Sequence, residues 1–144
     1  MPVYLADSSI WAWANKRSRP DIQEKLAERL ERDEIATCVP VALEVMHRAE
    51  SADQYEELFN RLLGPLRWLE LDDATARRAL DVQRELAGRS RGNHRRPAVD
   101  YLIAATGELA GAEVVTWFFD RDFRVICEHT GQPFEAETTT GPGH

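Results

Sequence analysis

The chain has 144 residues, of which 43% are hydrophobic and 30% are charged, and its formal net charge at pH 7 is −7. This length allows one domain with its own core and is too short for two ordinary ones, and the composition excludes disordered and fibrous proteins. The acidic balance argues against nucleic-acid binding by a broad basic face, so any such contact must come from a local patch.

In chain order, short β-prone segments alternate with helical patterns, several of which carry start or stop signals such as Pro20, Ser51, Gly64 and Gly111. The predicted elements are a strand at 3–6, a helix at 10–15, a helix at 20–33, a strand at 34–38, helices at 40–50 and 51–64, a strand at 66–71, helices at 72–90 and 97–111, a strand at 113–119, a helix at 120–131 and an edge strand at 132–137.

Strands that alternate with helices imply crossover connections, and hence an α/β fold with a parallel sheet covered on both faces. We expect one domain over residues 1–137 and a tail at 138–144 that frays. No apolar run approaches the roughly 18 residues of a membrane span, and no basic region precedes an apolar stretch at the N-terminus. A cytoplasmic protein is therefore expected, with Cys38 and Cys127 as buried free thiols rather than zinc ligands or a disulfide.

Two aspartates directly follow apolar strands. Asp7 comes after the strand at 3–6, and Asp120 comes after the strand at 113–119. Ligands of parallel sheets bind beyond the carboxyl ends of the strands, which is where both side chains would lie. The structural alternative for each is the N-cap of the helix that follows, because aspartate caps helices well.

Two further acids stand in apolar surroundings. Glu44 is the only polar residue of the stretch PVALEVM, where a buried carboxylate needs a partner, although it could instead tip into solvent beside Arg48. Asp100 lies in the first turn of the helix opened by Pro97, on a flank of small apolar residues, where compensation of the helix dipole would also explain it.

These four acids would meet at one edge if the two strands are neighbours and the two helices pack across them. Carboxylates about 5 Å apart repel by roughly 3 kcal/mol per pair at an effective dielectric near 20, so such a cluster needs protonation or a divalent cation. Oxygen ligands without a cysteine or histidine set favour Mg²⁺ or Mn²⁺, which suit hydrolysis of phosphate esters by an activated water.

Four stretches carry a resemblance to a known family: YLADSSIW, VALEVMHRA, HRRPAVDYLIAATGELAG and FFDRDFRVICEHTGQP. In this order and spacing they resemble PIN-domain ribonucleases, and among them the VapC toxins of toxin–antitoxin pairs. The resemblance implies a three-layer α/β/α sandwich with a central, mostly parallel sheet. It assigns catalysis and metal binding to four positions, namely Asp7, Glu44, Asp100 and Asp120.

The resemblance also assigns supporting roles. Asp122 would be auxiliary, although a helix cap explains it equally well, and Ser8 or Ser9 would orient a carboxylate or a water. One position departs from the family pattern, because Phe118 stands where related sequences often carry Thr, Ser or His. This departure puts in doubt a polar contact to Asp120, but not the acid itself.

The family's known properties supply the expected partners. Such proteins cleave structured RNA, are inhibited by a cognate antitoxin and commonly form homodimers. A basic segment would suit RNA phosphates at the rim of the site, through Arg91, His94, Arg95 and Arg96. A solvated loop is the alternative for this segment.

Three readings of the function remain open. The first is a metal-dependent endoribonuclease toxin of a type II toxin–antitoxin pair. The second, a phosphotransfer fold, needs a lysine facing a nucleophilic aspartate, and the chain has only Lys16 and Lys25, neither of which follows a late strand. The third is a non-catalytic PIN-fold module whose acidic groove holds a basic peptide partner.

Overall fold

The computed structural model describes residues 2–119 and 121–139. Within them, five strands form one sheet in the order β3-β2-β1-β4-β5, and every neighbouring pair is parallel. The strands are β1 (Val3–Ala6), β2 (Ile35–Thr37), β3 (Arg67–Trp68), β4 (Val114–Phe118) and β5 (Phe134–Ala136). The prediction of a parallel α/β fold is confirmed, with 132–137 contributing an edge strand.

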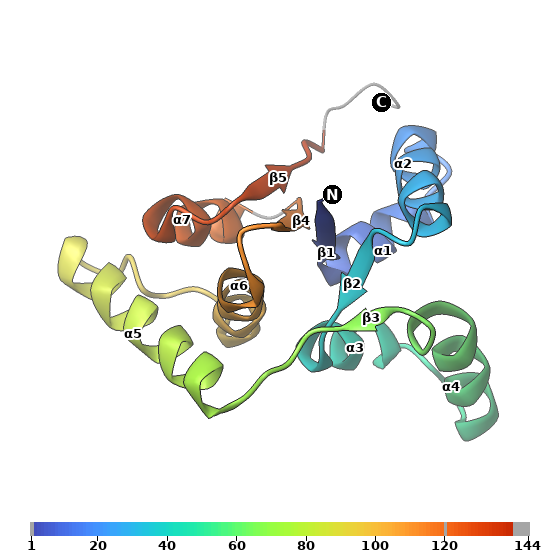
Figure 1. Ribbon diagram of the computed structural model, residues 1–144, viewed down its shortest axis with the longest axis horizontal. Coiled ribbons are helices and arrows are strands. Elements are labelled where there is room, and N and C mark those ends of the chain that lie inside the picture. The colour runs from blue at the N-terminus through green and yellow to red at the C-terminus, as the bar shows by residue number, and fades with distance from the viewer. Residues whose placement is uncertain (1, 120, 140–144) are drawn as a thin grey trace.

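The helices of the described residues follow the predicted order. They are α1 (Ser8–Ala14), α2 (Pro20–Glu31), α3 (Val39–Met46), α4 (Ala52–Leu58), the π-helix η1 (Phe59–Leu63), α5 (Asp73–Arg89), α6 (Ala98–Ala110) and α7 (Arg121–Thr130). Helices α5, α6 and α7 lie on one side of the sheet, and α1 and α2 lie on the other (Figure 1). The result is the expected three-layer sandwich.

Most boundaries shift by one or two residues from the prediction, and three elements differ by more. Helix α3 ends at Met46 rather than at residue 50, and the predicted helix at 51–64 divides into α4 and η1. The predicted strand at 66–71 shrinks to Arg67–Trp68, because its partner β2 has only three residues with which to pair. Element ends are the least certain part of a pattern-based prediction, since the pairing partner sets them.

The core lies on both faces of the central strands. Leu5, Trp117 and Phe118 of the sheet are fully buried, as are Ile10 of α1 and Ile103 of α6. Removal of these apolar side chains from water is the main force that holds the layers together. Cys38 and Cys127 are buried free thiols, as predicted, and burial raises the pKa of Cys38 to about 11 and that of Cys127 to about 12.

Helix α6 approaches the sheet closely at Gly107. A Cβ at this position would lie 2.5 Å from Oγ1 of Thr116 in β4, so only glycine allows this approach. Asp100 precedes Gly107 by two helical turns and therefore lies on the same face of α6. The glycine thus helps to set how near Asp100 comes to the sheet.

The C-terminal segment is held against α2. Arg19, which is 2% exposed, donates from Nη1 to the backbone oxygen of Thr138 over 2.6 Å, and Lys25 pairs with Glu137. Of the tail predicted at 138–144, only Thr138 and Thr139 belong to the described residues. No helix of the described ranges is long and apolar enough to cross a membrane.

Candidate active site

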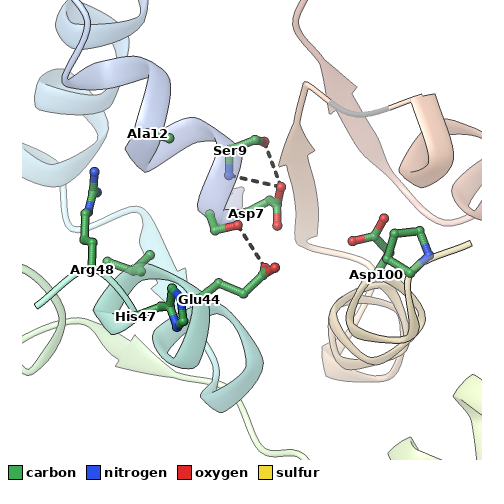
Figure 2. Close-up of a pocket in the computed structure, with 10 residues that line it drawn as sticks. Asp7, Ser9, Ala12, Glu44, His47, Arg48 and Asp100 are labelled. Atoms are coloured by element: carbon green, nitrogen blue, oxygen red, sulfur yellow. Dashed lines mark hydrogen bonds between the residues drawn. The ribbon is translucent and has the colours of Figure 1, made fainter.

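Three of the four predicted acids meet in one pocket. Asp7, Glu44 and Asp100 line a cavity of about 410 Å³ beside the carboxyl end of β1. Figure 2 shows their carboxyl groups directed toward the same space between α1, α3 and α6. The fold therefore brings together side chains that are far apart in the sequence.

Asp7 is the most buried acid of the pocket, at 3% exposure. It is also the N-cap of α1, because Oδ2 accepts from the Ser9 backbone N–H at 3.2 Å and from Ser9 Oγ at 2.7 Å. The other oxygen, Oδ1, is buried and has no hydrogen-bond partner among the described residues. Burial, followed by the charge of Glu44, raises the pKa of Asp7 to about 6 in spite of the Ser9 hydrogen bonds. The capping alternative thus holds for Asp7, and one oxygen still has no partner.

Glu44 lies on the exposed side of α3 rather than in an apolar environment. Its Oε1 accepts a hydrogen bond from Ser8 Oγ at 2.9 Å. Ser8 and Ser9, adjacent in the first turn of α1, therefore each hold one carboxylate of the pocket.

Asp100 lies in the first turn of α6 and is 6% exposed. Its backbone N–H donates to the oxygen of Pro97 at 3.1 Å, so the helix begins as the sequence predicted. The positive end of the helix dipole favours a carboxylate in this turn.

Asp120, the fourth predicted acid, lies outside the described residues. Next to it, the backbone N–H of Phe119 donates to Ser9 Oγ at 3.2 Å, which ties the end of β4 to the Asp7 hydrogen bonds. Among residues 2–119 and 121–139, no group of three His, Cys, Asp or Glu side chains is close enough to hold a metal ion by itself.

The basic segment that was predicted to contact RNA is divided by the fold. Arg96 donates to Asp122 Oδ1 at 2.6 Å and to the backbone and side-chain oxygens of Asn93, so it makes internal contacts. His94 is half-buried, and its backbone oxygen accepts from Tyr101. Arg91 and Arg95 remain exposed.

Phe118, the departure from the family pattern, belongs to the core. Its ring stacks on Phe123 at 5.1 Å and on Phe134 at 5.7 Å between centroids. Thr116 is fully buried and accepts from Gln132 Nε2 at 3.3 Å. Phe118 is apolar and Thr116 is buried, so neither residue provides an exposed polar group beside the pocket.

Two pocket residues escaped the sequence analysis as site residues. His47 and Arg48 line the same cavity as the acids. They follow Glu44 by three and four positions, which is one side of the helix predicted at 40–50, so periodicity could have indicated them. In the structure both lie just beyond the end of α3 at Met46.

The fold and the pocket define a parallel α/β protein with a carboxylate site at the edge where the strands end. The PIN domain model matches residues 4–128, and the chain belongs to this family. It is 35% identical over 134 residues to ribonuclease VapC18 of Mycobacterium tuberculosis, covering 92% of this chain and 93% of the relative. It is also 35% identical over 133 residues to ribonuclease VapC51 of the same organism, covering 90% and 89%.

A solved structure has the same fold. The crystal structure of VapBC2 from Rickettsia felis bound to a DNA fragment from their promoter matches with a TM-score of 0.71, covering 94% of this chain and 98% of that one. The sequence identity is 14%, so this likeness concerns the fold alone.

Proposed function

We propose that the protein is a metal-dependent endoribonuclease, the toxin of a type II toxin–antitoxin pair, and that it hydrolyses RNA phosphodiester bonds with an activated water. The relatives named VapC ribonucleases support the activity. The observation that carries the assignment to this site is the buried Oδ1 of Asp7, which has no hydrogen-bond partner among residues 2–119 and 121–139, in a pocket shared with Glu44 and Asp100.

The donor set fits a hard divalent cation. Asp7 is desolvated and repelled by Glu44, which a bound cation would relieve, and carboxylate oxygens favour Mg²⁺ or Mn²⁺ over softer metals. The described acids do not form a complete metal site, so the proposal takes Asp120 as a further ligand beside Asp7, Glu44 and Asp100. When bound, such a cation activates water and neutralises charge on the phosphate.

The chain's own residues orient the reacting groups. Ser9 holds Asp7 Oδ2 and Ser8 holds Glu44 Oε1, so both carboxylates are positioned before substrate arrives. Because Oδ2 of Asp7 already accepts two hydrogen bonds from Ser9, Oδ1 is the oxygen that would face the cation. The water oxygen would attack the phosphorus in line and release a proton to solvent, the bond from phosphorus to the leaving sugar oxygen would break, and that oxygen would take up a proton to become a hydroxyl, with no covalent enzyme intermediate.

The partners belong to the same proposal. The R. felis match is a VapBC complex, which supports a cognate antitoxin, and the acidic pocket suits a basic side chain of such a partner. Exposed apolar side chains on α3, Val39 and Leu43, supply surface that a second copy would cover in a homodimer. The free thiols suit a reducing compartment such as the cytoplasm.

The test is cleavage of structured RNA by the purified protein with Mg²⁺ or Mn²⁺, followed by mapping of the new 5′ ends. Asp7→Asn and Asp100→Asn are each expected to lower the rate by about 100-fold or more. Asp73→Asn, in an exposed ion pair on α5, is the matched control and should cleave like wild type. Equal rates in all four proteins would leave the non-catalytic, peptide-binding PIN module as the better reading.

A further inference from the structure

The negative charge of the pocket would repel an RNA substrate. Each phosphate of the strand is an anion, and three carboxylates line the cavity where the cleaved phosphate would lie. Cations beside the acids must therefore hold the neighbouring phosphates. Of the residues that line the cavity, only Arg48 and His47 can carry positive charge.

Building on the proposed function, we propose that Arg48 binds the backbone phosphate next to the cleaved one, and so fixes the register of the RNA strand in the pocket. Its guanidinium is planar and always charged, with donors spaced to match two phosphate oxygens. Arg48 would be a substrate-binding residue rather than a member of the hydrolytic set.

The side chain is available for such a contact. The Arg48 side chain is exposed, and it takes part in no ion pair or hydrogen bond with the described residues. Arg78 and Arg96 differ in this respect, since Arg78 pairs with Glu108 and Arg96 pairs with Asp122. A ligand can therefore bind the Arg48 guanidinium without breaking an ion pair within the protein.

The availability of Arg48 depends on a contact made elsewhere. Glu44 precedes it by four positions, but α3 ends at Met46 and Arg48 lies in the turn that follows, so the two charges do not pair along the helix. Instead, Glu44 Oε1 accepts from Ser8 Oγ at 2.9 Å. Figure 2 shows the Arg48 side chain running away from the Glu44 carboxylate, along the pocket toward Ala12.

This direction determines which phosphate is bound. The guanidinium lies at the side of the pocket away from the acids, so it reaches a flanking phosphate and not the one under attack (Figure 2). Arg48 also lines a neighbouring cavity of about 220 Å³ beside Trp11 and Leu26. A strand leaving the acidic pocket on this side would pass over Arg48.

The first experiment measures RNA affinity at low salt with a chelator, so that binding is separated from cleavage. Arg48→Gln is expected to raise Kd by about tenfold and to reduce the slope of log K against log salt by about 0.7, the value for one phosphate contact on a single strand. The Kd of Arg48→Lys should lie between that of wild type and that of Arg48→Gln. Arg32→Gln is the matched control, because Arg32 is exposed and precedes the amino end of β2, whereas the pocket lies at the carboxyl ends of the strands.

The second experiment locates the phosphate. Substrates carry one neutral methylphosphonate linkage at successive positions, and the Arg48→Gln penalty in KM should vanish only when the linkage next to the cleavage site is neutral. The kcat of Arg48→Gln should stay near that of wild type. Unchanged Kd and salt slope, or a penalty that persists at every neutral position, would overturn the inference.

The outcomes also separate this inference from the proposed function. Cleavage that depends on Asp100 but not on Arg48 would reject the phosphate contact alone. Binding that depends on Arg48 without any cleavage would reject the nuclease and keep the contact. If Arg48→Gln weakens only the affinity for an antitoxin, Arg48 binds a partner carboxylate and the RNA contact is rejected.

Discussion

Arg96 donates from Nη1 to Asp122 Oδ1 over 2.6 Å, joining the loop before α6 to the first turn of α7. The same guanidinium donates to the backbone and side-chain oxygens of Asn93. Helix α6 carries Asp100, and α7 begins directly after residue 120. The pair thus connects the segment that leads into Asp100 with the helix that follows residue 120.

A double-mutant cycle tests this connection. Arg96→Gln should lower the free energy of unfolding by about 1–3 kcal/mol, because it removes the hydrogen bonds that the guanidinium donates to half-buried Asp122 and Asn93. Asp122→Asn should lower the free energy of unfolding by less than Arg96→Gln does, because the hydrogen bonds from Arg96 to Asn93 remain. Urea denaturation of both single variants and the double variant should give a coupling energy of about 0.5–3 kcal/mol. Additive effects would mean that the two side chains do not depend on each other.

The stability of the metal-free protein should depend on the protonation of Asp7. Its pKa is raised from 3.8 to about 6, so between these values the folded state holds a proton that the unfolded state has released. Stability is therefore highest below pH 3.8 with respect to this group and falls as pH rises through 6, by roughly 3 kcal/mol.

The measurement compares wild type with Asp7→Asn by urea denaturation from pH 4 to pH 8 in the presence of a chelator. As pH rises across this window, the free energy of unfolding of wild type should fall relative to that of Asp7→Asn. The substitution itself can add a difference between the two proteins, but that difference does not depend on pH. A difference that does not change with pH would contradict the raised pKa.

Divalent cations should stabilise the folded protein by binding the carboxylates of the pocket. At about 100 times its Kd, a bound ion contributes about 2.7 kcal/mol, which for a domain of this size raises Tm by about 5–10 °C. We expect this shift with Mn²⁺ in wild type and Asp73→Asn, and its loss in Asp7→Asn and Asp100→Asn. Thermal melting with and without Mn²⁺ measures it, and an equal shift in all four proteins would place the ion elsewhere.

Two glycine substitutions should have opposite consequences. Gly107→Ala places a Cβ 2.5 Å from the buried Oγ1 of Thr116, and overpacking of about 1–3 kcal/mol should outweigh the helix propensity gain of about 1 kcal/mol. Gly88→Ala on α5 meets nothing within 4 Å and should leave stability unchanged or raise it by at most about 1 kcal/mol. Urea denaturation measures the free energy of unfolding of both variants. Gly107→Ala should also slow RNA cleavage, because it displaces Asp100.

The order of the elements could be predicted because each follows a local rule. Pro97 and Gly111 bracket α6 as expected, and Pro20 opens α2. Alternation of strands and helices indicated the parallel sheet, since parallel neighbours need crossover connections. The ends of α3 and β3 were predicted poorly, because pairing and packing partners set them.

The site was partly accessible from the sequence. Acids placed after strands and in a helix first turn indicated the edge of the sheet, and Asp7, Glu44 and Asp100 do line one pocket there. Asp120 remains a prediction. The basic segment was read as one patch because charge spacing does not say which arginine points inward, as Arg96 does.

The sequence by itself determined the kinds of element, their order, the family and which acids were candidates, since these depend on periodicity, caps and motifs within short stretches. Only the tertiary structure decided that Ser8 holds Glu44, that Arg96 holds Asp122 and that the Arg48 side chain lines the pocket with no partner in the described part of the chain. A polar side chain takes its partner from whatever packing brings within about 3 Å, and residues 26 or 36 positions apart carry no local mark of that meeting.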